Sequence, residues 1–261
     1  MKRREFIGTS CVAAGVAAMG AVATGAEGPA PAAKEFLELR LYRAEAGAMR
    51  EKLDKFLAEV AIPAWNRLGI QPVGVFAFPD DKVADLYVLL PHKTIESFAT
   101  AAQKLWADAE YTKAGAAALD PPKGEPIYKR IESSLMLAFD AVPKVETPTK
   151  KDTRLFQLRI YESHCEERAR RKVAMFNTGG EVALFRQVGM PPVFFGETLV
   201  GSKVPNLAYM LGFDDEATQK AAWAKFMAHP EWKKMSGDPQ YKDTVSNITN
   251  LVLKPTAYSQ V

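Results

Sequence analysis

Two six-residue segments of the sequence have the alternating pattern of a half-buried strand, and they resemble each other closely. Residues 37–42 read Leu-Glu-Leu-Arg-Leu-Tyr, and residues 156–161, which start 119 residues later, read Phe-Gln-Leu-Arg-Ile-Tyr. Successive side chains of a strand point to opposite faces, so the apolar residues share one face and the polar residues share the other. This repeated strand constrains the fold more than any other feature of the chain.

The similarity between the two regions extends beyond these strands. The segments that correspond, in the same order, are Phe56 with Phe176, residues 68–73 with 188–193, residues 85–90 with 206–211, and residues 126–129 with 239–242. The offset between them drifts by one residue and later shortens by several, as expected where loops carry the insertions. The sequence therefore predicts a duplicated domain, with a first copy over 35–140, a linker over 141–152 and a second copy over 153–261.

Each copy has the order strand, helix, strand, strand, helix, strand. In the first copy, apolar residues recur at helical spacing over about 47–61, two apolar runs within 72–90 form a hairpin, and a last strand follows near 127–139. This ferredoxin-like order leaves one face of a four-stranded sheet bare. Two such sheets can cover each other's bare faces. We therefore expect an α+β fold in which two tandem ferredoxin-like repeats (β-α-β-β-α-β) pair within the chain as a closed or nearly closed barrel.

The amino terminus has the features of an export signal. Residues 2–4 are Lys-Arg-Arg, and they precede an apolar stretch over 11–23 that is rich in Gly and Ala and too short for a comfortable membrane span. Residues 1–26 are therefore predicted to be a twin-arginine signal peptide, followed by a spacer over 27–34. The mature protein is then expected to be periplasmic or extracytoplasmic. An uncleaved anchor or a buried helix is the alternative.

The composition limits the partners of the mature protein. The formal net charge is +3, and residues 2–4 supply most of this excess, so we expect no attraction to nucleic acid and no stable membrane insertion once the signal is removed. Signal removal also leaves Cys165 as the one cysteine, which excludes an intrachain disulfide. No metal site is predicted, because metal ligands are normally closely spaced and the three histidines are not: His92, His164 and His229.

The strand pattern also selects candidate site residues. If the apolar faces of the two repeated strands pack beneath the helices, the Arg and Tyr side chains of both strands project between the sheets. A buried arginine needs a partner, which is either an internal carboxylate such as Glu38 or an anionic group on a bound ligand. His229 precedes Pro230, so a helix-end packing role competes with roles as a general base or a haem ligand. The candidate ligand-binding residues are Arg40, Tyr42, Arg159, Tyr161, Tyr209 and His229.

Several segments of the second half together carry a family resemblance: residues 156–162, 176–177, 189–193, 205–211, 223–226, 229–232, 247–250 and 255–259. On these residues the second half resembles the NIPSNAP family. The first half keeps residues 39–42, Gly69 and Tyr128 but has Asp-Ala-Glu-Tyr at 108–111 where the second half has His-Pro-Glu-Trp at 229–232, and it resembles a diverged copy. The resemblance implies a dimeric α+β barrel and supplies no catalytic residue.

Two classes of function are open. The sequence has no Gly-rich phosphate loop after a strand and no Gly-x-Ser-x-Gly nucleophile motif. This favours a non-catalytic module that binds a small molecule, or an interaction partner, in a cavity of the barrel. The alternative is an enzyme acting on an aromatic or anionic compound. Barrels related to the family include cofactor-free monooxygenases and haem enzymes, so such an enzyme would be monooxygenase-like or isomerase-like and, less readily, haem-dependent. No cofactor is predicted, and a homo-oligomer is compatible with the sequence.

Overall fold

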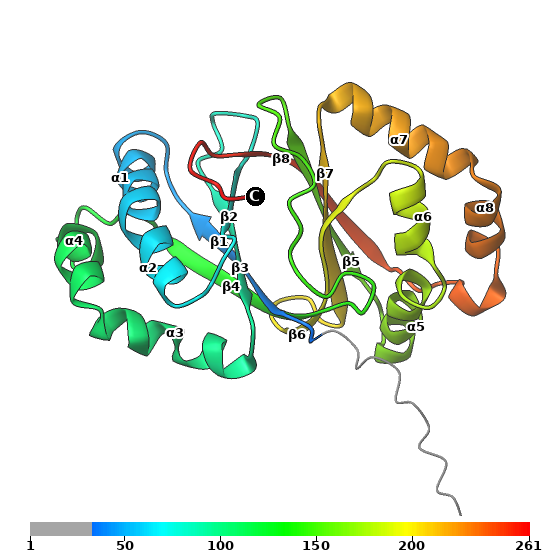
Figure 1. The fold of residues 1–261 in the computed structure, drawn as a ribbon, viewed down its shortest axis with the longest axis horizontal. Helices are drawn as coiled ribbons and strands as arrows, with labels where there is room; N and C mark the ends of the chain where they lie inside the picture. The colour runs from blue at the N-terminus through cyan, green and yellow to red at the C-terminus, as the bar shows by residue number, and fades with distance from the viewer. Residues whose placement is uncertain (1–32) are drawn as a thin grey trace, which may run out of the picture. The chain divides into compact units, whose positions relative to one another are not determined.

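The computed structural model describes residues 33–261, in which helices lie on two sides of a closed antiparallel barrel (Figure 1). The predicted signal peptide and residues 27–32 of the predicted spacer lie outside this described region. Within residues 33–261, no helix combines the length and the apolar character that crossing a membrane requires.

The helices and strands follow one another in the same general order in both halves. The first half contains β1 (Phe36–Arg43), α1 (Ala48–Phe56), a π-helix η1 (Leu57–Ala61), α2 (Ile62–Arg67), β2 (Gly74–Ala77), β3 (Leu86–His92), α3 (Ile95–Ala107), α4 (Ala109–Leu119) and β4 (Arg130–Ala138). The second half contains β5 (Leu155–Glu162), α5 (Glu166–Phe176), α6 (Glu181–Gln187), β6 (Pro192–Val200), β7 (Asn206–Phe213), α7 (Glu216–Ala228), α8 (Pro230–Ser236), a 3₁₀ helix η2 (Pro239–Tyr241) and β8 (Asn247–Pro255).

The barrel has eight strands, in the order β1-β3-β2-β8-β5-β7-β6-β4, and every neighbouring pair is antiparallel. Each half contributes four consecutive strands of the barrel, and the two halves join where β2 pairs with β8 and where β4 pairs with β6. The expectation of an α+β fold with a closed barrel is confirmed. In Figure 1 the helices of the first half lie on one side of the strands and those of the second half lie on the other.

The interior of the barrel is filled by apolar side chains from both halves. Phe76 and Phe156 meet there with ring centroids 4.9 Å apart, and both are fully buried. The other members of this interior cluster include Leu37, Leu39, Leu89, Met136, Leu158, Val193, Phe194, Met210 and Leu253. Two further apolar clusters lie between the strands and the helices, one in each half.

The faces of β1 and β5 are therefore opposite to the expected ones. The alternation is as predicted, but Leu37 and Leu158 point into the barrel, whereas Tyr42 and Tyr161 pack beneath the helices of their own halves. The physical reason is the supply of polar partners. The barrel interior is lined by aliphatic and phenyl side chains, which cannot satisfy a guanidinium. The layer beneath the helices offers the guanidinium of Arg40 the carboxylate of Glu38, and it offers that of Arg159 the electron-rich rings of Tyr161 and Trp223.

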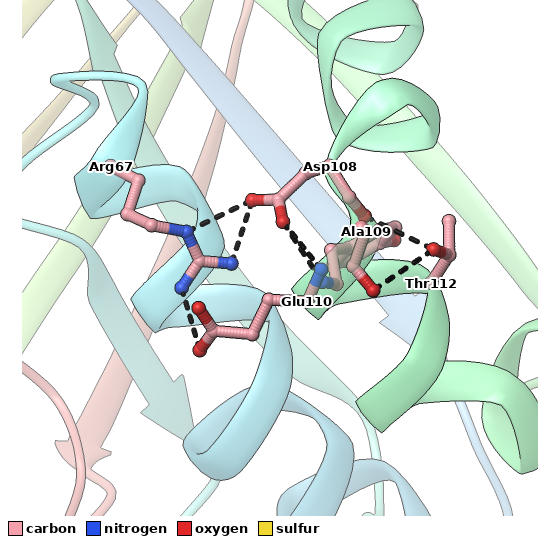
Figure 2. Close-up of polar contacts among 6 residues, drawn as sticks. Arg67, Asp108, Ala109, Glu110 and Thr112 are labelled. Atoms are coloured by element: carbon pink, nitrogen blue, oxygen red, sulfur yellow. Dashed lines mark hydrogen bonds and ion pairs between the residues drawn. The ribbon is translucent and has the colours of Figure 1, made fainter.

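In each half, the last two α-helices (α3 and α4, or α7 and α8) are joined by one residue, and its side chain caps the second of them. Asp108 ends α3 and begins α4, and its Oδ1 accepts hydrogen bonds from the backbone N–H groups of Glu110 (2.9 Å) and Tyr111 (3.1 Å). Its Oδ2 accepts two hydrogen bonds from Arg67, at 2.9 and 2.7 Å, and Arg67 also pairs with Glu110 at 3.1 Å (Figure 2). Asp108 therefore fastens α2 to α4.

His229 occupies the corresponding junction of the second half. It ends α7 and begins α8, and its Nδ1 accepts a hydrogen bond from the backbone N–H of Glu231 at 3.3 Å. Pro230 follows at the first position of α8, where the missing N–H costs no hydrogen bond. The helix-end role that competed with a ligand-binding role for His229 is thus the one that its contacts support.

Candidate functional site

Arg40 lies in the middle of β1 and is neutralised by a carboxylate of its own strand. Its Nε and Nη2 donate hydrogen bonds of 2.7 and 3.0 Å to the two carboxylate oxygens of Glu38. Ser133 of β4 donates a third hydrogen bond, of 2.8 Å, to Glu38 Oε1. The guanidinium carbon also lies 5.6 Å from the centroid of the Trp65 ring. The internal partner expected for Arg40 is therefore present.

The surroundings of Glu38 keep its carboxylate ionised. Burial alone would raise the pKa of Glu38, but His92, the charge of Arg40 and the hydrogen bonds from Arg40 and Ser133 outweigh it and lower the pKa to about 2. The imidazole Nε2 of His92 is fully buried and lies 3.5 Å from Glu38 Oε2, while its Nδ1 lies 3.2 Å from the hydroxyl of Ser97. The carboxylate of Glu38 is thus surrounded by Arg40, Ser133 and His92.

Arg159 occupies the matching position in β5 but has no carboxylate partner. Gln157 stands where the first half has Glu38, two residues before the arginine. Within residues 33–261, Arg159 forms no ion pair, and its Nε atom is buried without a hydrogen-bond partner. The guanidinium carbon lies 4.8 Å from the ring centroid of Trp223 and 5.3 Å from that of Tyr161. The side chain is only partly buried, so solvent reaches a cation that its own half does not neutralise.

Gln157 cannot act as a hidden partner for this arginine, because other groups occupy its amide. Its Oε1 accepts hydrogen bonds from the indole N–H of Trp223 at 2.6 Å and from Gln219 at 3.0 Å. Its Nε2 donates to Asn250 Oδ1 of β8 at 2.7 Å. The amide is therefore used to hold α7 and β8 against β5, and it leaves the positive charge of Arg159 uncompensated.

Polar groups deeper beneath the helices extend the cluster. The hydroxyls of Tyr161 and Tyr209 lie 3.0 Å apart, and burial raises the pKa of both phenols, so both are neutral near pH 7. Lys172 of α5 forms a buried ion pair of 2.8 Å with Glu181 of α6. Burial raises the pKa of Glu181, although Lys172 and, more weakly, Arg159 oppose this. Because there are two cations and at most one anion, the cluster carries a net positive charge.

The predicted site residues thus separate into three places. Arg159, Tyr161 and Tyr209 lie together in the second half, Arg40 and Tyr42 lie together in the first half, and His229 caps α8. The contacts of this first group with Lys172 of α5 and Trp223 of α7 place it beneath these two helices, not between the two sheets. None of these positions tests whether the residues bind a ligand, so that role stays a prediction.

Sequence reasoning missed Lys172 and Glu181. A run of basic residues on a helix ordinarily faces solvent, and this is true of Arg170 and Arg171, since both pair with Glu167 on the exposed face of α5. Lys172 itself is only 4% exposed. Its spacing of three and four residues from the buried Ala169 and Phe176 was the signal that could have placed it on the inner face of the helix. Among the described residues, no group of His, Cys, Asp and Glu side chains has a metal-binding arrangement.

Comparison with known proteins agrees with this division of the chain. The model of the NIPSNAP family matches residues 156–260, which run from β5 to the carboxyl-terminal tail. The second half is a NIPSNAP domain. It contains Arg159, Tyr161 and Tyr209, together with Trp223, which lies against Arg159. No curated protein matches the chain in sequence.

Solved structures match either about two fifths of the chain or most of it. A NIPSNAP-like domain protein from Burkholderia xenovorans is 22% identical, with a TM-score of 0.37, and the match covers 41% of this chain and 90% of that one. A candidate monooxygenase from Fusobacterium nucleatum matches with a TM-score of 0.56 at 8% identity, over 86% of this chain and 93% of that one. A second candidate monooxygenase, from Lactobacillus acidophilus, has a TM-score of 0.54 at 8% identity, over 85% and 94%. At such low identity the two longer matches show a shared fold.

Proposed function

We propose that the protein is a small-molecule-binding module whose NIPSNAP domain holds an anionic ligand at Arg159. The observation that carries this proposal is the partly exposed guanidinium, which has no carboxylate partner and whose buried Nε has no hydrogen-bond partner among the described residues. Leaving a buried donor of a charged group unsatisfied costs free energy, and a ligand anion would remove that cost. The site lies between the strands and helices of the second half, whereas the interior of the barrel is filled by apolar side chains.

The first half supports this interpretation by showing what a structural arginine looks like in the same fold. Arg40 has a bidentate carboxylate partner, and Glu38 is held in turn by Ser133. If Arg159 were needed only for packing, the same solution would serve it. Gln157 instead leaves the positive charge of Arg159 without a carboxylate, while its amide bonds β5 to β8 and α7.

An enzyme acting on an aromatic or anionic compound is the second candidate function. It is favoured by the fold shared with the two candidate monooxygenases, and by the paired hydroxyls of Tyr161 and Tyr209 beside Arg159. The raised pKa values of both tyrosines argue against a phenolate base at neutral pH. Binding is therefore the function that the geometry supports best. Haem-dependent chemistry has no support in the contacts of His229, which caps α8.

Native mass spectrometry of the purified full chain, compared with its denatured mass, tests the proposal. We expect a copurifying small molecule that is lost from an Arg159→Leu variant whose circular dichroism matches that of the wild type. Arg171→Leu is the matched control, because it removes the same charge from the outer face of α5. A ligand that survives in Arg159→Leu would contradict the proposal, as would an Arg159→Leu variant that simply unfolds.

We also propose that the two halves are tandem ferredoxin-like repeats and that the chain is exported by the twin-arginine route. The strand orders β4-β1-β3-β2 and β8-β5-β7-β6 within the barrel support the first point. Residues 2–4 and the apolar stretch at 11–23 support the second. A reporter that is active only after twin-arginine export, fused to residues 1–34, tests the signal. Replacing Arg3 and Arg4 together by Lys should abolish its activity.

A further inference from the structure

We propose that the anionic group recognised at Arg159 is the carboxylate of an apolar monocarboxylic acid, bound side-on by Nε and Nη2 of the guanidinium and by the side-chain amide of Asn250. This inference rests on the proposed function and names the chemical class of its ligand. It comes from using the contacts of Arg40 with Glu38 and Ser133 in the first half as a template for the surroundings of Arg159 in the second.

The two arginines lie at matching points of the barrel. Arg40 of β1 lies opposite Val88 of β3 on one side and Ser133 of β4 on the other. Arg159 of β5 lies opposite Tyr209 of β7 and Asn250 of β8. Each arginine is therefore in the central strand of its half, with one neighbour from the fourth strand of that half directly across from it. Donors at these matching points can be compared one by one.

The carboxylate of Glu38 shows how this position binds an anion. It lies along the side of the guanidinium, with one oxygen 2.7 Å from Nε and the other 3.0 Å from Nη2. Two parallel N–H···O bonds of this kind bind an anion through two of its oxygens, and a carboxylate has just two. The third donor comes from the fourth strand, where Ser133 contacts Glu38 Oε1.

The guanidinium of Arg159 has no carboxylate partner among the described residues. Its Nε is the atom that lacks a partner. The third donor corresponds to Asn250, whose orientation is set by a chain of contacts. The indole N–H of Trp223 can only donate, so the Gln157 atom 2.6 Å from it is the oxygen. The Gln157 nitrogen therefore faces Asn250 and takes its Oδ1 as acceptor. The Nδ2 of Asn250 keeps its N–H donors for a ligand, since none of the described residues accepts from it.

The surface beside these donors indicates the rest of the ligand. Ile248 and Val252 flank Asn250 on the same face of β8, and they are 46% and 37% exposed. Two exposed branched side chains on either side of an anion-binding point suit an apolar body attached to the carboxylate. One negative charge also balances the net charge of the cluster, in which Arg159 and Lys172 face the single carboxylate of Glu181.

Nuclear magnetic resonance of the arginine Nε–H groups tests this inference, because Arg40 provides a control within the same molecule. Benzoate and hexanoate are titrated into the full chain, beside inorganic phosphate and neutral benzamide. We expect a saturable downfield shift of the Arg159 Nε–H signal with both carboxylates, little change with phosphate or benzamide, and no movement of the Arg40 signal, whose Nε is already bonded to Glu38.

Three variants complete the test. Gln157→Glu places a carboxylate where Glu38 lies in the first half, and should weaken carboxylate binding about tenfold or more without unfolding the protein. Asn250→Ala should weaken it several-fold, whereas Ser133→Ala, the matched change in the first half, should leave it unaltered.

Unchanged binding in Gln157→Glu would overturn the inference. If phosphate moves the Arg159 signal and carboxylates do not, the ligand class is wrong although the proposed anion site stands. If none of these anions moves the signal and no ligand copurifies, the ligand class and the proposed anion site at Arg159 are both wrong.

Discussion

The arginines at the centres of β1 and β5 have matching positions in the barrel and different electrostatic surroundings. Arg40 is held by Glu38, and that carboxylate is held in turn by Ser133, so the charge of Arg40 is compensated without a ligand. Arg159 lies over aromatic rings, has no carboxylate partner among the described residues and keeps an unpaired buried Nε. The exchange of Glu38 for Gln157 at one position is enough to separate a structural arginine from one that is available to bind.

Two single variants, Glu38→Gln and Gln157→Glu, are expected to show the largest difference in stability between the two halves. Glu38→Gln leaves the charge of the largely buried Arg40 uncompensated and should lower the free energy of unfolding by about 3 kcal/mol. Gln157→Glu supplies a carboxylate to a cation that lacks one, and should change it by less than about 1 kcal/mol in either direction. Urea unfolding of both variants measures the difference. Equal losses of unfolding free energy in the two variants would contradict the view that Arg40 needs a carboxylate partner and Arg159 does not.

The buried carboxylate of Glu38 should make the stability of the protein depend on pH. The pKa of Glu38 is about 2 in the folded protein and 4.5 in its ordinary range, so the folded state favours the carboxylate. This contribution is fully present above pH 4.5 and is lost as the pH falls from there towards 2. It amounts to at most about 3 kcal/mol. The loss on acidification should be smaller in Glu38→Gln than in the wild type when both are unfolded with urea at pH 3 and pH 6. A parallel pair of curves would assign the acid sensitivity to other groups.

The helix junctions provide a smaller comparison between the halves. Asp108→Ala removes the cap of α4 and both hydrogen bonds to Arg67, and should cost about 1–2 kcal/mol. His229→Ala removes one weaker cap of α8 and should cost less than about 1 kcal/mol, with no change in binding at Arg159. Thermal unfolding and the carboxylate titration measure the two effects. Loss of binding in His229→Ala would instead support the ligand-binding role predicted for this histidine.

Most of the candidate residues could be predicted from the repeated strand, whereas their surroundings could not. The Arg-x-Tyr pattern identified Arg159 and Tyr161, and the contacts of Tyr161 with Tyr209 then joined a third predicted residue to them. Lys172 escaped because a lysine among arginines on a helix is ordinarily solvated, and only the packing of α5 against α6 places it beside Glu181. Asn250 escaped because no local pattern links a residue of β8 to one of β5.

The amino-acid sequence by itself determined the strand alternation, the order of helices and strands, and the presence of an Arg and a Tyr on one face of each central strand. Only the tertiary structure decided which face lies inside the barrel. Alternation divides a strand into two faces but does not say which of them is covered by helices. That depends on which layer offers partners to a guanidinium. Closure of the barrel filled its interior with apolar groups such as Phe76 and Phe156, and it left both arginines in the helix-covered layers, where Glu38 neutralises Arg40 and no carboxylate neutralises Arg159 among the described residues.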